Sequence, residues 1–395
     1  MKLIKNITRV FLIITLNFSF AQTHDSYYQS IVDNCSLSSI QTNLDEFVNH
    51  GVKSIGSTEL VNAKDWLKAK YASYGYTDIV EDDFSVGGGN TATNIVVTKQ
   101  GLVYPDTYVI IDGHYDTING VGANDNGSGT VLILEIARLL ANVPTEYSIK
   151  FINFSAEEVG LIGSQHYVDN VVNATTPKMD IRLVFNIDEV GGINGMTNDT
   201  IVCEEDTSNP PGNNAQSSVM TNELATCIGL YSSLNTEISY AYASDYIPFE
   251  NNGEIITGLY EKNETPHAHT ATDVIANMDV NYVYEITKGS TGALLHFAVA
   301  NQALTVGEEV NNTIDLRFFP NPTQGILYIK SNDLINKDLI INLYSIVGKL
   351  VLSKEFVLKN DTAKDSVSLK GIQSGVYILE AITNGNKTTQ KIIVK

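Results

Sequence analysis

Histidine and carboxylate side chains recur where predicted strands end. The first pair is His114 and Asp116, in the run Gly-His-Tyr-Asp that closes the apolar segment 108–113. Side chains repeat every two residues along an extended chain, so both project from the same side. Asp116 could accept the proton on one imidazole nitrogen of His114 and leave the other nitrogen for a metal. Alone, a histidine near a strand end is more often a structural residue than a metal ligand.

Two further segments place carboxylates beside predicted helices and strands. The glycine-rich segment 122–129, Gly-Ala-Asn-Asp-Asn-Gly-Ser-Gly, puts Asp125 just before a predicted helix at 127–143. An ordinary capped turn would have the same composition. Glu157 and Glu158 directly follow a predicted strand at 148–154. Adjacent carboxylates repel each other unless they are solvated or a cation lies near them. One of them can therefore bind a metal while the other serves as a general base.

The remaining candidates are Asp188, which follows the apolar segment 183–187, and His269, which lies in a polar loop with His267. Five segments thus supply His, Asp, Glu, Asp and His. These are the ligands that zinc takes when thiolates are absent. Their joint occurrence predicts a metal site.

The elements that would position these residues alternate between strands and helices. Apolar strands are predicted at 92–98, 108–113, 148–154 and 183–187, and helical patterning covers 43–74 and 127–143. This alternation predicts an α/β fold with a mostly parallel central sheet flanked by helices on both faces. Ligands bind such sheets beyond the carboxyl ends of the strands, where the candidate residues lie.

The chain divides into several parts. Residues 1–21 have two lysines, an apolar core and a small-residue end, which predicts a signal peptide. We expect a catalytic domain at 22–304, a polar linker at 305–317 and a small all-β sandwich at 318–395, where short alternating strands are separated by turn residues. Beyond the signal peptide, no apolar run is long enough to span a membrane.

Charge and cysteine content exclude some functions. The formal net charge of -20 is opposite to what a nucleic-acid-binding protein needs, so no nucleic acid partner is expected. The three cysteines, Cys35, Cys203 and Cys227, lack the close spacing of a structural zinc site. At most one disulfide can form, and Cys203 with Cys227 is the favoured pair.

Four motifs in order resemble the M28 family of two-zinc aminopeptidases over residues 27–301. They contain His114-Tyr115-Asp116, the glycine-rich segment 122–129, Ser-Ala-Glu-Glu-Val-Gly at 155–160, and His-Thr-Ala-Thr-Asp at 269–273. The resemblance implies that one zinc is bound by His114 and Asp188, that the other is bound by Glu158 and His269, and that Asp125 bridges them. It further implies Glu157 as the general base and Asp116 as the residue that orients His114.

The chain departs from the family pattern at one motif. Family members often carry Ser-Asp-His ahead of the final loop, whereas this chain has Ser244-Asp245-Tyr246. Some members also use a nearby tyrosine to hold the reaction intermediate. Tyr240 and Tyr242 flank the matching position without occupying it.

The resemblance implies a secreted enzyme that removes single residues from peptides with a free N-terminus. The α-amine of the substrate would pair with an acidic group beside the metals. Related alternatives are a carboxypeptidase, which needs cationic residues for the substrate carboxylate, and a glutaminyl cyclase, which holds a single zinc. A remote alternative is an exported binding module without catalytic activity, which would have lost Glu157 or a ligand.

The C-terminal segment resembles the sorting domains of type IX secretion. The resemblance lies in Phe-Pro-Asn-Pro-Thr at 319–323, Gly-Ile-Gln-Ser-Gly-Val-Tyr at 371–377 and the basic end Lys-Ile-Ile-Val-Lys at 391–395. It implies export across the outer membrane by the type IX machinery and an extracellular protein. A substrate-binding β-sandwich appended to an enzyme is the alternative.

Overall fold

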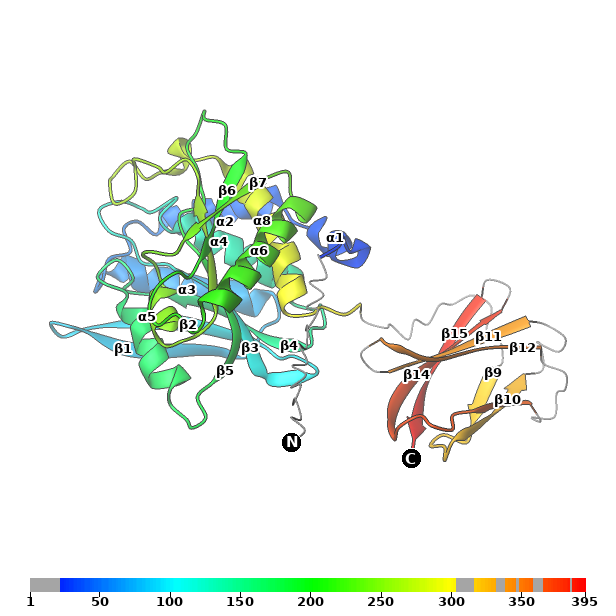
Figure 1. Cartoon of the computed structure of the whole chain (residues 1–395). Coiled ribbons are helices and arrows are strands. Elements are labelled where there is room, and N and C mark those ends of the chain that lie inside the picture. The colour runs from blue at the N-terminus through cyan, green and yellow to red at the C-terminus, as the bar shows by residue number, and fades with distance from the viewer. Residues whose placement is uncertain (1–21, 303–315, 332–337, 346–347, 358–364, 384–385) are drawn as a thin grey trace, which may run out of the picture. The chain divides into compact units, whose positions relative to one another are not determined.

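The computed structural model describes residues 22–302, 316–331, 338–345, 348–357, 365–383 and 386–395 (Figure 1). The chain forms two compact units that divide between Ala300 and Asn301. Each unit encloses its own hydrophobic core. The signal peptide predicted at 1–21 and most of the linker predicted at 305–317 lie outside the described residues.

An eight-stranded sheet forms the centre of the first unit, in the order β1-β2-β4-β3-β5-β8-β6-β7. Its strands are β1 (Ile79–Gly87), β2 (Asn90–Lys99), β3 (Tyr104–His114), β4 (Tyr147–Phe154), β5 (Asp180–Ile187), β6 (Thr200–Glu205), β7 (Asn235–Tyr240) and β8 (Ile256–Glu261). The pairs β3-β4, β3-β5, β5-β8 and β6-β7 are parallel. The pairs β1-β2, β2-β4 and β6-β8 are antiparallel. A mostly parallel sheet, as predicted, is confirmed.

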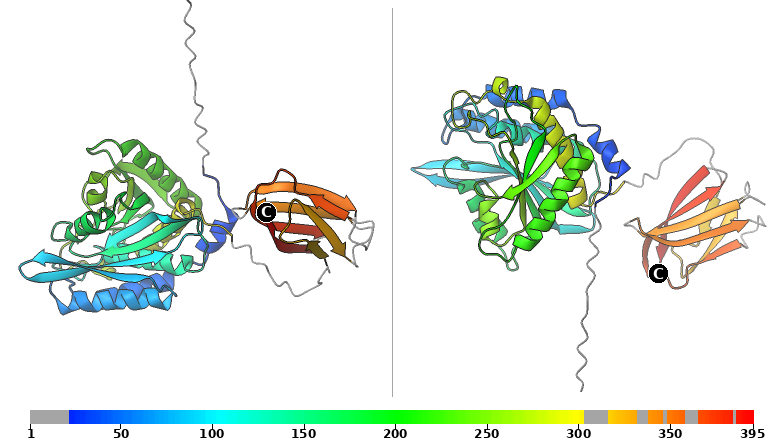
Figure 2. Two further views of the ribbon diagram at one scale, coloured as in Figure 1. Left: turned by 90° about the horizontal axis from the view of Figure 1, so that it is seen from below. Right: turned by 45° about the horizontal axis from the view of Figure 1, so that its top comes forward.

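Helices pack on both faces of this sheet (Figure 2). They are α1 (Ser26–Val32), α2 (Leu37–Asn49), α3 (Thr58–Ser73), α4 (Gly127–Leu140), α5 (Ile162–Tyr167), η1 (Val168–Val172), α6 (Asn214–Tyr231), α7 (Ile247–Asn251), η2 (Ile275–Asn277) and α8 (Val280–Phe297). Alternate residues of β3 enter different cores, as the two-residue period of a strand requires. Val109 and Ile111 pack with α3, α4, α6 and α8, whereas Ile110 packs with α5, η1 and α7. The prediction that helices cover both faces of the sheet is confirmed.

The parallel strands β3, β4, β5 and β8 end at one edge of the sheet, because parallel neighbours run in the same direction. Two glycines allow β3 and α4 to pack closely against the C-terminal end of β5. A Cβ atom added to Gly113 or Gly129 would lie 2.5 or 2.6 Å from the backbone oxygen of Ile187. Any other residue would therefore push β3 or α4 away from the end of β5.

Two sequence-based expectations need correction. The helical pattern at 43–74 is two helices, α2 and α3, and Gly51 and Gly56 between them have φ of 85° and 82°. The disulfide favoured for Cys203 and Cys227 is wrong, since both are free, buried thiols. Cys203 lies in β6 and Cys227 in α6, where both side chains pack in the apolar core, and the Cys227 thiol donates a hydrogen bond to Gln22.

The second unit consists of two antiparallel sheets, in the orders β13-β10-β9 and β12-β11-β14-β15. Its strands are β9 (Leu316–Phe319), β10 (Ile326–Ser331), β11 (Asp338–Ser345), β12 (Leu350–Val357), β13 (Asp365–Ser368), β14 (Gly375–Thr383) and β15 (Asn386–Val394). Both sheets contribute to one core, which includes Leu327, Ile341 and Leu379. The predicted small all-β unit is confirmed, although β9 already begins at Leu316, inside the expected linker. Each helix in the described part of the chain is too short or too polar to cross a membrane.

Candidate metal centre and active site

The predicted catalytic and metal-binding residues lie together at the C-terminal ends of the parallel strands. His114 is the last residue of β3, Asp188 follows β5, and Asp125 lies in the turn before α4. Glu157 and Glu158 follow β4, and His269 lies in the loop after β8. Two of these segments contain residues with left-handed backbone, Ala156 with φ of 62° and His269 with φ of 56°. Such conformations are costly for residues with a side chain and concentrate at functional sites.

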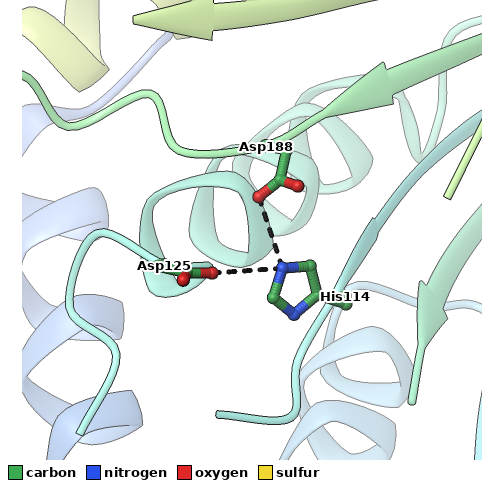
Figure 3. A group of neighbouring side chains, drawn as sticks. All are labelled: His114, Asp125 and Asp188. Carbon is green, nitrogen blue, oxygen red and sulfur yellow. Dashed lines mark ion pairs between the residues drawn. The ribbon is translucent and has the colours of Figure 1, made fainter. Parts of the chain in front are cut away.

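One group of candidate ligands consists of His114, Asp125 and Asp188 (Figure 3). His114 Nε2 lies 3.2 Å from Asp125 Oδ1 and 3.3 Å from Asp188 Oδ1. The His114 side chain is 1% exposed, so its imidazole is shielded from bulk water. Burial would lower the pKa of His114, but the nearby carboxylates, chiefly Asp188 and Glu157, raise it well above its ordinary value.

The second group consists of Asp125, Glu158 and His269. His269 Nε2 lies 3.0 Å from Asp125 Oδ2 and 2.8 Å from Glu158 Oε2. The two groups therefore share Asp125, and each of its oxygens faces a different imidazole. Burial would raise the pKa of Asp125, but its close contacts with both histidines hold it below its ordinary value.

These distances and the donor set fit a pair of zinc ions. Zinc binds imidazole nitrogen and carboxylate oxygen at about 2.0–2.2 Å, so two ligands of one tetrahedral ion lie about 3.4 Å apart. Asp125 Oδ2 and Asp188 Oδ1 are buried and accept no hydrogen bond. Unsatisfied buried carboxylate oxygens are costly, and coordination to a cation would satisfy them.

Glu157 lies beside both groups without belonging to either. Its Oε2 is 3.9 Å from His114 Nε2, and its side chain is 17% exposed. Burial raises the pKa of Glu157 to about 7. A carboxyl group with a pKa near neutrality can both accept and return a proton.

Asp116 has a different set of contacts from the one that the sequence suggests. His114 Nδ1 lies 3.1 Å from the backbone oxygen of Asp116, whereas the Asp116 carboxylate is 3.8 Å away. That carboxylate accepts the backbone N–H groups of Glu157 and Glu158 instead. Asp116 thus contacts His114 through its main chain and the glutamate pair through its side chain.

Three supporting residues received no role from the sequence. Asp273 accepts the backbone N–H groups of Asn124 and Asp125, at 2.8 and 3.1 Å. Ser244 donates to Asp188 Oδ2 at 2.7 Å. Glu261 accepts from the side chain of Asn124 and from the backbone of Gly192 and Thr265. Asp273 and Ser244 belong to motifs that the sequence shows. Their hydrogen-bond partners, which lie in other segments of the chain, could not be predicted from it.

Tyr246 occupies the position where the family often has histidine. It is 1% exposed, and its hydroxyl donates to Glu204 Oε2 at 2.9 Å. The same hydroxyl accepts the backbone N–H of Tyr242 at 3.3 Å. The side chain therefore binds the neighbouring loop and β6.

Comparison with known families identifies both units. Residues 94–291, about half of the chain, match the model of peptidase family M28. This chain belongs to peptidase family M28. Residues 317–395 match the secretion system C-terminal sorting domain. The M28 segment contains His114, Asp125, the glutamate pair, Asp188 and His269.

Similar proteins agree with this assignment. Aminopeptidase YwaD of Bacillus subtilis is 36% identical over 196 residues, which are 48% of this chain and 41% of that protein. The chain thus spans less than half the length of that curated relative. The Legionella pneumophila LapA aminopeptidase has the same fold, with a TM-score of 0.62, 21% identity, and coverage of 76% of this chain and 81% of that one. Glutaminyl cyclase from Macrostomum lignano also shares the fold, with a TM-score of 0.62 and 14% identity over 72% of this chain and 96% of that one.

Proposed function

We propose that the protein is an exported zinc aminopeptidase that removes the N-terminal residue of peptides. The observation that carries the proposal is the pair of ligand groups sharing Asp125, with Glu157 beside both and outside each. His114, Asp188 and Asp125 would hold one zinc ion, and Asp125, Glu158 and His269 the other. Bound zinc would polarise the scissile carbonyl and lower the pKa of a water molecule.

Glu157 would move the proton in this reaction. Its carboxylate takes a proton from the attacking water at Oε2 and returns it to the nitrogen of the leaving amine, so that the amide C–N bond breaks and Glu157 is regenerated. Asp116 would hold the backbone of Glu157 in place through the N–H bond at 3.2 Å. Ser244 would orient Asp188 through its hydroxyl.

The C-terminal unit would direct export. A secretion sorting domain supports transport by the type IX machinery and an extracellular location. Peptides with a free N-terminus would then be hydrolysed outside the cell.

A hydrolysis panel tests the proposed function. The zinc-loaded protein should hydrolyse aminoacyl-anilides and unblocked peptides, should leave N-terminally blocked peptides intact, and should lose activity with chelator. Release of C-terminal residues from blocked peptides would instead indicate a carboxypeptidase. Cyclisation of N-terminal glutamine with one bound zinc would indicate a glutaminyl cyclase, which has the same fold.

A further inference from the structure

A buried lysine, Lys53, lies in the connection between α2 and α3, outside the segment that matches family M28. Among the described residues it is the only lysine or arginine that is buried, with an exposure of 0%. Taking an ammonium group out of water is costly unless hydrogen bonds and opposite charges compensate. The groups around Lys53 must therefore offset this cost.

Three backbone carbonyl groups surround the ammonium group of Lys53. Its Nζ donates to the oxygen of Val121 at 2.8 Å, to that of Gly51 at 2.9 Å and to that of Phe47 at 3.4 Å. The ring of Phe47, with its centroid 3.8 Å from Nζ, adds a cation–π contact. Three acceptors match the three N–H donors of an ammonium group, whereas a neutral amine has one donor fewer. These contacts thus favour the charged form of Lys53.

The charges of two buried carboxylates also act on Lys53. Burial lowers the pKa of Lys53 to about 7, and the charges of Asp273 and Asp116 oppose this change. Asp273 accepts the backbone N–H groups of Asn124 and Asp125. Asp116 accepts those of the glutamate pair. Lys53 therefore supplies a positive charge to the carboxylates that support the metal centre.

Lys53 holds the segment that leads from β3 to the shared ligand Asp125. The N–H of Thr117 donates to the backbone oxygen of Lys53 at 3.1 Å, and the hydroxyl of Thr117 accepts the Lys53 N–H at 2.9 Å. The main chain of Lys53 thus binds one end of segment 117–121, and its side chain binds the other end at Val121. Asp125 lies only four residues after Val121.

The same segment packs against the loop of His269. A Cβ atom added to Gly120 would lie 2.1 Å from the backbone oxygen of Thr270, the residue after His269. The N–H of Ala123 donates to the backbone oxygen of Asp273 at 3.4 Å. A shift of segment 117–121 would therefore disturb Asp125, which both ligand groups share, and His269 as well.

We propose that Lys53 is a positioning residue of the metal centre and that its positive charge holds segment 117–121, and with it Asp125 and the His269 loop. This inference rests on the zinc site of the proposed function, although not on its substrate. Nζ contacts backbone carbonyl groups and no candidate ligand, so its effect on zinc is indirect. Loss of the charge would leave buried carbonyl groups without a donor, which is costly.

Zinc affinity tests the role of the charge. Lys53→Met keeps the stem of the side chain but removes the ammonium group. It should bind zinc about 10- to 100-fold more weakly, as other variants do that lose a partner supporting metal ligands. Competition with a chromophoric chelator measures this affinity without a substrate. Lys64→Met, which removes a lysine that pairs with Glu81 at 2.6 Å, is the charge-matched control and should bind zinc like the wild type.

Chemical rescue separates the charge of Lys53 from its bulk. Lys53→Ala leaves space for a propylammonium ion, which matches the part of the side chain that is removed. Propylammonium should recover most of the lost zinc affinity, whereas propan-1-ol, which is similar in size but uncharged, should recover little. Equal recovery with both additives would show that Lys53 only fills space and would overturn the proposal. Wild-type zinc affinity in Lys53→Met would overturn it too.

Hydrogen exchange on the zinc-free wild type tests the proposal even if the variants do not fold. If Lys53 holds segment 117–121, its hydrogen-bonded amides should be protected before zinc is added. Protection that appears only with zinc would show that the metal orders the segment, which contradicts the proposal. In Lys53→Met, exchange should be about tenfold faster or more in residues 117–125 and unchanged in β4. If these results hold but no aminoacyl-anilide is hydrolysed, the peptidase proposal fails and the role of Lys53 stands.

Discussion

The carboxylate of Asp116 accepts the backbone N–H of Glu157 at 3.2 Å. Its second oxygen lies 3.4 Å from the N–H of Glu158. One buried side chain therefore fixes the segment that presents both the proposed general base and a proposed zinc ligand. Because His114 Nδ1 is bonded to the main chain of residue 116, this role is separable from the orientation of His114.

Substitutions of Asp116 should therefore affect turnover more than metal binding. Asp116→Ala leaves two N–H groups without an acceptor and should lower kcat about 10- to 100-fold, as for other supporting residues of metal sites. Asp116→Asn keeps one acceptor oxygen and should be intermediate. Zinc content, measured by elemental analysis beside kcat, should stay near the wild-type value. Zinc loss as severe as in His114→Ala would show instead that Asp116 acts through His114.

The two adjacent glutamates should respond differently to the same substitution. Glu157→Gln should keep the bound zinc but lower kcat about 100-fold or more, since general-base catalysis contributes about 10²–10⁴. Glu158→Gln should lose zinc, because His269 and Glu158 form one ligand group. Parallel measurement of metal content and turnover distinguishes the roles, and equal metal loss in both variants would refute the division.

Zinc removal should identify Asp125 as a shared ligand. The purified protein should bind about two zinc ions, and chelation should abolish activity and lower Tm, because the metal binds the folded state. Asp125→Ala should lose both ions, whereas Asp188→Ala should lose chiefly the ion of the His114 group. A single tightly bound ion in a fully active enzyme would contradict the two-zinc arrangement.

The buried pair of Glu204 and Tyr246 predicts a pH-dependent stability. Burial raises the pKa of Glu204 to about 8, despite the hydrogen bond from Tyr246, which lowers it. Between its ordinary pKa of 4.5 and about 8, the folded state holds a proton that the unfolded state releases. The stability that Glu204 contributes is thus present at low pH and is lost as pH rises through this window.

Glu204→Gln should remove this dependence. The free energy of unfolding of the variant, relative to wild type, should rise between pH 5 and 8 by at most about 1.4 kcal/mol per pH unit. Urea denaturation of the first unit at several pH values measures it. A difference that is constant across this range would show that Glu204 is ionised in the folded protein.

The C-terminal unit should be dispensable for catalysis. The first unit and the second unit each enclose their own core, so a chain of residues 22–304 should fold, hydrolyse anilides with unchanged kcat and keep its Tm within a few degrees. We expect natural processing near residues 304–317 after export. An insoluble or inactive product from this truncation would assign 318–395 a role in folding or substrate binding.

Much of the site was predictable because its ligands lie where strands end. Apolar runs identified β3, β4 and β5. The four motifs gave His114, Asp125, Glu158 and His269, and the end of the apolar segment 183–187 gave Asp188. Four strands of the sheet were not predicted. β7 and β1 are largely exposed and lack the apolar run of a buried strand. β6 and β8 are mostly buried but only six residues long. The hydrogen bond between Tyr260 and Glu189 could not be predicted either, since the two residues lie 71 positions apart in sequence.

Asp273 connects the loop of His269 to the backbone of Asp125, across 148 residues of sequence. The groups that would hold zinc are thus assembled from segments that meet only when the sheet, α4 and the final loop are all in place. In a nascent or partly unfolded chain these candidate ligands are far apart. The proposed peptidase activity would therefore appear only once the first unit has completed its fold.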